Sequence, residues 1–219
     1  MAHVIWDWNG TLMDDFPLLL AAANDTLVAH GGEAISVERY RSTFRRPVHQ
    51  FYAELLDRDL SESEWAALDR HFHDHYSANV EHAKLSSGAA GVLADIGAAG
   101  HSQSLLSMWF HHELVPFVES RGVSGHFVRM DGRPGDATAG SKTPHLARHV
   151  EALVSDGHDV AELVMIGDTV DDAQAARDNG IAIVLFAGGE FNIERLEATG
   201  APVATTLAEA AELAGVARV

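Results

Sequence analysis

The stretch HVIWDWNGT, residues 3–11, decides the fold, because a short apolar run passes directly into a polar segment that contains a glycine. A run of this kind is typical of a buried strand. The polar residues that follow it would lie at the edge of a sheet, where ligands of α/β proteins bind. We therefore expect the first strand at residues 3–6 and a site that begins at Asp7.

From residue 86 onward, short apolar runs alternate with helical patterns. This alternation predicts a parallel sheet covered by helices on both faces, which is a doubly wound, Rossmann-like α/β fold. Residues 132–140, rich in Gly, Asp and Thr, are expected to form a loop. The expected helices are residues 91–99, 110–121, 143–154, 171–179 and 193–198, and the expected strands are residues 104–107, 127–130, 163–166 and 181–186.

Residues 17–84 show helical patterns and no convincing strand. Ser36 and Ser61 are candidate N-caps, and Pro47 is a typical first residue of a helix. The simplest architecture is an α/β core domain of residues 1–15 and 86–219, interrupted by an all-helical domain of residues 16–85. The size of this insert is that of a small lid.

The composition excludes several classes of protein. The chain has 219 residues, with 15 Lys plus Arg against 32 Asp plus Glu, and its net charge of −17 opposes binding to nucleic acid or to an anionic membrane. It has no cysteine, which excludes disulfides, thiolate metal sites and cysteine nucleophiles. Because the sequence shows neither a signal peptide nor a run of about 18 apolar residues, we expect a soluble, cytoplasmic protein.

The residues that suggest chemistry fall where the expected strands end: Asp7, Ser107, Lys142 at a helix start, and the segment GDTVDD at residues 167–172. They offer carboxylates for a hard cation, hydroxyls, a lysine and backbone N–H groups for an anion. Magnesium favours one or two carboxylates together with phosphate oxygens, and a lysine neutralises developing charge. An aspartate can serve as the nucleophile. The set therefore predicts phosphoryl transfer.

These four segments, in this order and at these spacings, resemble the haloacid dehalogenase (HAD) superfamily, in particular its phosphoglycolate-phosphatase-like branch with a helical (C1-type) cap after the first motif. The resemblance covers nearly the whole chain. It implies a HAD core with a cap domain, and a magnesium-dependent phosphomonoester hydrolase that forms an aspartyl-phosphate. The expected substrate is a small phosphorylated metabolite, such as phosphoglycolate.

The resemblance also implies catalytic roles. Asp7 would be the nucleophile and a magnesium ligand, and the backbone carbonyl of Asn9 would be another ligand. Ser107 would hold the phosphoryl group. Lys142 would neutralise both Asp7 and the phosphate.

Two further acids, Asp168 and Asp172, would hold or orient magnesium. Asp172 is preferred to Asp171 because the family places its second acid four residues after the first, and Asp171 would favour the start of the next helix. Two residues just after the nucleophile would bind substrate. Two arginines in the insert would also bind substrate through their guanidinium groups, and an equally good interpretation is that they are solvated on a loop. These four residues are Gly10, Thr11, Arg45 and Arg46.

Asn9 departs from the family pattern, because most phosphatases of the superfamily carry at this position an aspartate that protonates the leaving oxygen and later activates water. An amide cannot transfer that proton, and loss of a general acid/base typically costs about 10²- to 10⁴-fold in rate. The enzyme would then use leaving groups that need little protonation, or use another donor such as Asp14 or Asp15. The remaining alternative is a catalytically weak protein that binds, transfers or senses phosphate.

Dehalogenases and phosphonate hydrolases of the superfamily also replace this residue. A phosphonate hydrolase needs a cap lysine that forms an imine, and the insert offers only Lys84 at its edge. Dehalogenation needs no metal, so the acidic segment at residues 167–172 argues against it. The phosphatase is therefore the first hypothesis.

Overall fold

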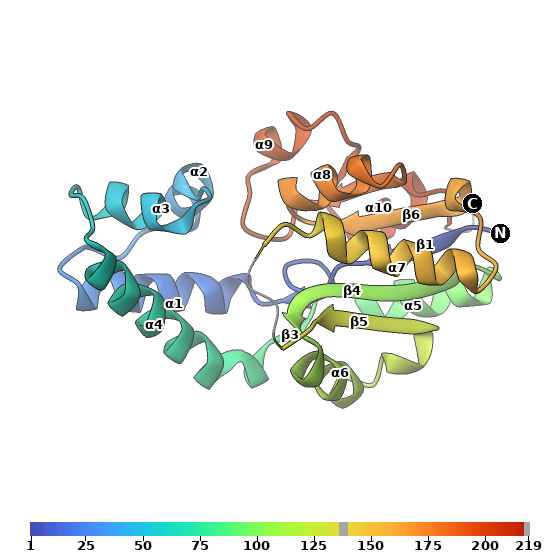
Figure 1. Ribbon diagram of the computed structural model, residues 1–219, viewed down its shortest axis with the longest axis horizontal. Helices are drawn as coiled ribbons and strands as arrows, with labels where there is room; N and C mark the ends of the chain where they lie inside the picture. Colours follow the sequence, from blue (N-terminus) through green and yellow to red (C-terminus); the bar gives the residue numbers. More distant parts are fainter. Residues whose placement is uncertain (136–139, 217–219) are drawn as a thin grey trace. The chain divides into compact units, whose positions relative to one another are not determined.

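The computed structural model describes residues 1–135 and 140–216 (Figure 1). Six strands form one sheet in the order β5-β4-β1-β6-β7-β8. Each strand pairs in parallel with its neighbours. The strands are β1 (His3–Trp6), β4 (Ser102–Phe110), β5 (Arg129–Arg133), β6 (Leu163–Gly167), β7 (Ala182–Phe186) and β8 (Val203–Ala204).

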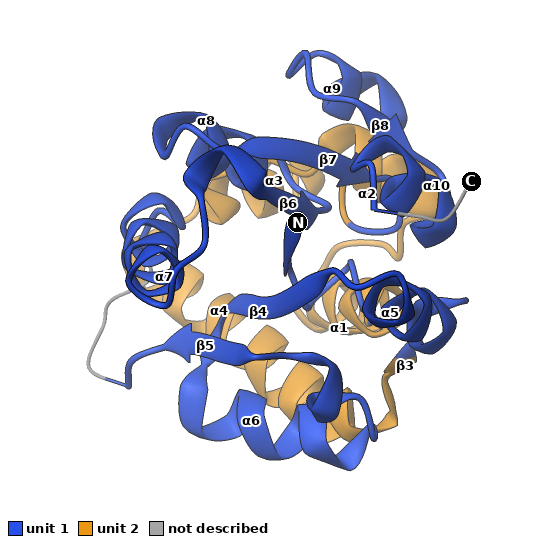
Figure 2. Cartoon of the chain, turned by 90° about the vertical axis from the view of Figure 1, so that its right-hand side faces the viewer, with its two compact units in different colours: residues 1–14, 85–189, 193–219 blue, residues 15–84, 190–192 orange. Residues whose placement is uncertain are grey.

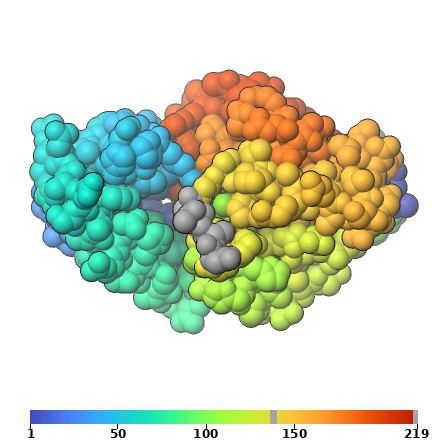
Figure 3. All heavy atoms as spheres, in the orientation of Figure 1, coloured from blue at the N-terminus to red at the C-terminus, as the bar shows by residue number. Residues whose placement is uncertain are grey.

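Helices cover both faces of this sheet. On one face α7 and α8 pack on each other and on β4, β6 and β7, and on the opposite face α5 and α10 pack on each other and on β4, β7 and β8 (Figure 2). The outer side of α7, drawn in yellow to orange, lies at the surface (Figure 3). The predicted doubly wound α/β fold is confirmed. The helices are α5 (Ala89–Ala98), α6 (His111–Ser120), α7 (Thr143–Ser155), α8 (Val170–Asp178), α9 (Ile193–Glu197) and α10 (Leu207–Leu213).

Three expectations about strands need correction. β4 does not end at Ser107 but continues to Phe110, with a shift in its register to β5 between Leu106 and Phe110. β5 extends over the first two residues of the expected 132–140 loop, of which residues 136–139 lie outside the described residues. The short strands β2 (Met13–Asp14) and β3 (Lys84–Leu85) form a two-stranded sheet. The prediction of no strand within residues 17–84 was therefore wrong at Lys84, where β3 begins. Strands of two residues are too short to show a periodic pattern.

A chain of hydrogen bonds, buried at its centre and half-buried at its two ends, joins β1, β4, β5 and α7. It runs from Ser102 through His3, Ser104 and His149 to Asp131, with successive distances of 2.7, 2.7, 2.8 and 2.7 Å. The carboxylate can only accept, so Nδ1 of His149 donates to Asp131. Burial, with the nearby His158 and His149, lowers the pKa of His3 to about 3, which agrees with a neutral ring. We call these five residues the histidine chain.

The described chain divides into two compact units (Figure 2). Unit 1 comprises Met1–Asp14, Leu85–Gly189 and Ile193–Val219, and unit 2 comprises Asp15–Lys84 and Glu190–Asn192. Unit 2 contains α1 (Phe16–Ala29), α2 (Val37–Thr43), α3 (Val48–Leu55) and α4 (Glu62–Asn79). None of the described helices is long and apolar enough to cross a membrane.

Unit 2 has an aromatic core of its own. Phe44 stacks on Tyr40 with ring centres 5.2 Å apart and meets Phe51 edge-on at 5.4 Å. Phe191, which follows β7 in the sequence, also lies against Phe44, with ring centres 5.6 Å apart. Aromatic pairs at these distances stabilise a small helical unit beyond the burial of their area.

Candidate active site

Asp7 lies directly after β1, at the carboxyl edge of the sheet. Its backbone N–H donates to the carbonyl of Ile166 at 2.8 Å and so continues the pairing of β1 with β6. The chain then turns tightly, because the N–H of Met13 returns to the carbonyl of Trp8 at 2.8 Å. Within the turn, Gly10 has a φ of +71°, and a Cβ there would lie 2.2 Å from Oδ2 of Asp168. Glycine therefore allows both the turn and the close approach of that carboxylate.

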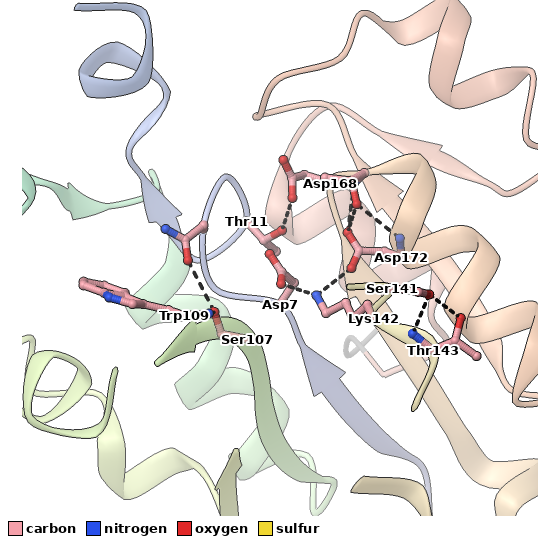
Figure 4. Close-up of polar contacts among 11 residues, drawn as sticks. Asp7, Thr11, Ser107, Trp109, Ser141, Lys142, Thr143, Asp168 and Asp172 are labelled. Carbon is pink, nitrogen blue, oxygen red and sulfur yellow. Dashed lines mark hydrogen bonds and ion pairs between the residues drawn. The ribbon is translucent and has the colours of Figure 1, made fainter. Parts of the chain in front are cut away.

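Three buried carboxylates meet beyond this turn. Oxygens of Asp7, Asp168 and Asp172 lie within 4.8 Å of one another, and we call these residues the acidic cluster. Nζ of Lys142 lies between two of them, donating to Asp7 and, at 2.6 Å, to Oδ1 of Asp172 (Figure 4). All four side chains are buried. Asp171, by contrast, is not a member of the cluster.

The first turns of two helices hold Lys142 and Asp172. Lys142 immediately precedes α7, and the N–H of Thr143 donates to the hydroxyl of Ser141 at 3.1 Å, which fixes the backbone on both sides of the lysine. Asp172 belongs to a capping box: its Oδ2 accepts from the hydroxyl of Thr169 at 2.6 Å, and its N–H donates to that hydroxyl at 3.1 Å. One carboxylate oxygen of Asp172 therefore caps α8, while the other faces Lys142.

Gly167 and Gly189 also make room for the cluster, and the sequence analysis assigned neither of them a role. A Cβ at Gly167 would lie 2.6 Å from Cγ of Asp172, and one at Gly189 would lie 1.7 Å from Oδ2 of Asp168. Neither has a positive φ. Glycine is therefore required at both positions by close packing, and this packing can be recognised only in the folded chain.

Charge in the acidic cluster is unbalanced. Burial and the charge of Asp172 raise the pKa of Asp7 to about 7, against the opposing effect of Lys142. Burial acts to lower the pKa of Lys142, but Asp172 and Asp7 outweigh it and raise that pKa. The lysine therefore stays protonated while Asp7 carries its charge at a free-energy cost. An additional cation would relieve this cost.

The hydroxyls of Thr11 and Ser107 donate to different groups. Thr11 is fully buried, and its hydroxyl donates to Oδ1 of Asp168 at 3.3 Å. Ser107 donates to Oδ1 of Asn9 at 3.3 Å and accepts from the N–H of Trp109 at 3.1 Å (Figure 4). Ser107 thus lies beside Asn9 in unit 1, whereas the hydroxyl of Thr11 already supports the cluster.

Other residues singled out in the sequence lie elsewhere. Arg45 belongs to unit 2, where it forms an ion pair with Glu54 and donates to the carbonyl of Gln50 at 3.3 Å. Arg46, next to it, is also in unit 2, and a substrate-binding role for either arginine stays a prediction. Asp14 is exposed, while Asp15 is buried and accepts a hydrogen bond from Tyr76 at 2.6 Å.

The sequence profile of the haloacid dehalogenase-like hydrolases matches residues 4–186. The chain belongs to this family. Among curated HAD relatives, the phosphoglycolate phosphatase of Caulobacter vibrioides is 29% identical over 208 residues, covering 91% of this chain and 84% of its own. That of Vibrio parahaemolyticus is 27% identical over 224 residues, covering 97% and 96%. The expected family and its phosphoglycolate-phosphatase-like branch are confirmed.

Solved structures share the fold of this chain. A predicted phosphoglycolate phosphatase from Haemophilus somnus matches with a TM-score of 0.74 at 18% identity, covering 97% of each chain. Protein tyrosine kinase A from Mycobacterium tuberculosis matches with a TM-score of 0.75 at 24% identity, covering 98% of each chain. As expected from the motifs, the chain is an enzyme, a HAD-type hydrolase of the phosphatase class.

Proposed function

We propose that this HAD hydrolase is a magnesium-dependent phosphomonoesterase whose nucleophile is Asp7. The observation that carries the proposal is the buried contact of Lys142 with Asp7 and Asp172 inside a cluster of three carboxylates. The cluster lies at the carboxyl edge of the sheet, where ligands of doubly wound proteins bind. A buried, hydrogen-bonded lysine is suited to neutralise the phosphate and the charge that develops on it.

The donor set fits a hard divalent cation. Asp7, Asp168 and Asp172 supply oxygen ligands, and the backbone carbonyl of Asn9 would add another. Three carboxylates lie beside one lysine, and burial, together with the charge of Asp172, raises the pKa of Asp7 to about 7. When bound, magnesium would stabilise negative charge on the phosphoryl oxygens.

The reaction would proceed in two displacements. A carboxylate oxygen of Asp7 attacks phosphorus, the ester P–O bond breaks, and the departing oxygen takes a proton as the aspartyl-phosphate forms. Water then attacks phosphorus, loses a proton, and releases phosphate while Asp7 is restored. Lys142 and the hydroxyl of Ser107 would hold the phosphoryl oxygens, with the backbone N–H groups of Gly10 and Thr11.

Asn9 determines which leaving groups the substrate can have. Its side chain accepts a hydrogen bond from Ser107 and has no proton to transfer at neutral pH. Esters with good leaving groups would therefore react faster, and hydrolysis of the aspartyl-phosphate would be slow. By analogy with the curated relatives, the substrate would be a small phosphorylated acid such as phosphoglycolate. Unit 2 would act as the cap, with Arg45 and Arg46 contacting substrate.

Asn9 also supports a second function, a catalytically weak HAD protein that binds, transfers or senses phosphate. Such a protein would retain the metal site and Lys142 and would turn over slowly. Tight binding of a phosphorylated metabolite without phosphate release would favour it.

The experiment that separates these functions is phosphate release from a panel of small esters, including an activated aryl phosphate, with and without Mg²⁺. Asp7→Asn is measured beside Asp171→Asn, a neighbouring acid outside the acidic cluster. We expect magnesium-dependent release that is lost in Asp7→Asn and kept in Asp171→Asn. No release from folded wild-type protein would contradict the phosphatase and make phosphonates and haloacids the next substrates to test.

A further inference from the structure

Arg133 is a cation that meets no carboxylate among residues 1–135 and 140–216. Its guanidinium lies over the ring of Phe110, 4.2 Å from the centroid. Its Nε is buried and has no hydrogen-bond partner in the described chain. Other arginines, including Arg58 and Arg129, form ion pairs with acids. Arg148 and Arg177 also form no ion pair in the described chain, but they have hydrogen-bond partners there, whereas Nε of Arg133 is buried without one.

Arg133 lies at the same edge of the sheet as the acidic cluster. It is the last residue of β5 and pairs with Phe110, the last residue of β4, the strand that carries Ser107. Neighbouring strands are about 4.8 Å apart, so β5 lies about 10 Å from β1 and only one strand spacing from Ser107. A carbon chain of two or three atoms bridges one such spacing.

His145 links Arg133 to the catalytic lysine. This residue lies in the first turn of α7, three positions after Lys142. Burial lowers the pKa of its ring, and the charges of Arg148, Arg133 and Lys142 lower it further. Arg133 and Lys142 therefore act on the same ring, from β5 and from the start of α7.

The backbone before Arg133 is held in one place. The N–H of Gly132 donates to Nδ1 of His111 at 3.2 Å. A Cβ on Gly132 would lie 2.6 Å from Cα of His111 and 2.8 Å from the carbonyl oxygen of Trp109. The end of β5 is thus packed closely against the junction of β4 and α6, and the Phe110 ring supports the guanidinium. Such an arrangement lowers the entropy lost when the arginine binds a ligand.

We propose that Arg133 determines specificity by binding a carboxylate on the phosphorylated substrate, at the far end from the phosphoryl group. The proposal rests on the proposed phosphatase function and adds to it the residue that binds the carboxylate of a substrate of two or three carbons. A guanidinium binds a carboxylate through two parallel hydrogen bonds. One arginine matches the single charge of a carboxylate, while the net charge of −17 disfavours larger polyanions.

The test compares two esters of equal size, phosphoglycolate and 2-hydroxyethyl phosphate, which differ in whether the far end is charged. In Arg133→Gln, we expect the ratio of their kcat/KM values to fall by about 10- to 100-fold, mainly through KM for phosphoglycolate. Arg133→Lys keeps the charge but not the two parallel bonds, so it should restore part of the ratio. The matched control is Arg121→Gln, another arginine over an aromatic ring of unit 1, which should leave the ratio unchanged.

An unchanged ratio in a folded, active Arg133→Gln variant overturns the inference and leaves the phosphatase standing. Wild-type protein that hydrolyses neither ester contradicts the phosphatase instead. In that case calorimetric binding of the same two compounds decides the role of Arg133. A wild-type preference for phosphoglycolate that Arg133→Gln removes supports the inference, and equal affinities in both proteins reject it.

Discussion

The acidic cluster and the histidine chain are both buried polar groups, and both are built on β1 and α7. β1 carries His3 at its start and leads to Asp7 at its end, while Lys142 precedes α7 and His149 lies within it. Along the histidine chain every group has a partner, and the lowered pKa of His3 keeps that ring neutral. In the acidic cluster one lysine contacts two of three carboxylates, and burial raises the pKa of Asp7 to about 7. The hydrogen-bonded groups of the histidine chain stabilise the sheet. The acidic cluster has more negative than positive charge, and it is where a cation and a phosphate would bind.

The largest effect should follow from Asp7→Asn, which removes the proposed nucleophile from the acidic cluster. We expect phosphate release to fall by about 10⁴-fold or more. The thermal midpoint should stay the same or rise, because one of three facing carboxylates is neutralised and Lys142 keeps its 2.6 Å bond to Asp172. Calorimetry and phosphate release measure the two effects, and a lower midpoint would mean that the cluster is not strained.

Asn9→Asp supplies the missing proton donor beside the cluster. Ser107 can still donate to the new carboxylate, so the local contact is retained. For esters with poor leaving groups we expect release to rise by up to about 10²- to 10⁴-fold, with a smaller gain for an aryl phosphate. Rates across a leaving-group series test this. A decrease for every ester would show that the amide itself assists catalysis.

His149→Leu interrupts the histidine chain. It removes the hydrogen-bond partner at 2.8 Å from Ser104 and the donor at 2.7 Å from Asp131. We expect a loss of about 2–4 kcal/mol in the free energy of unfolding, measured in urea. Arg148→Ala, at an exposed position of the same helix, is the control and should change stability by less than about 0.5 kcal/mol. Equal losses in both variants would remove any special role for the histidine chain.

The smallest effect concerns pH. Because the pKa of His3 falls from 6.5 to about 3 on folding, the unfolded chain binds a proton between these values that the folded chain does not. This contribution to stability is complete above pH 6.5 and declines as pH falls, by up to about 1.4 kcal/mol per unit. Between pH 6.5 and 5, His3→Gln should show a flatter decline than wild type, and His112→Gln, at an exposed position, should not. Parallel curves for all three proteins would contradict a neutral His3.

The sequence predicts the alternating strands and helices of unit 1 because the buried strands are short apolar runs. It misplaces the end of β4, since polar and aromatic residues from Ser107 to Phe110 continue the strand through a shift in register. The motif spacing selects Asp172 over Asp171, and the structure brings Asp172 into the acidic cluster. The spacing of the motifs does not predict the histidine chain, whose members are far apart in the sequence.

Two features depend on contacts that no local pattern encodes. The histidine chain joins His3 to Ser104 and His149, residues far apart in the sequence. Arg133 falls within a stretch that reads as a loop, and its significance comes from the cross-strand ring of Phe110 and from the lack of a described acidic partner. Both require the folded neighbours to be known.

The central claim is that Asp7 carries the phosphoryl group during turnover. Because Asn9 cannot activate water, the aspartyl-phosphate should accumulate and survive a rapid acid quench. The decisive measurement is mass spectrometry of peptides from protein quenched during turnover of an aryl phosphate. We predict one added phosphoryl group on the peptide that contains Asp7, dependent on Mg²⁺ and absent from Asp7→Asn. Phosphate release that continues in Asp7→Asn, without any modified peptide in wild type, would contradict the account.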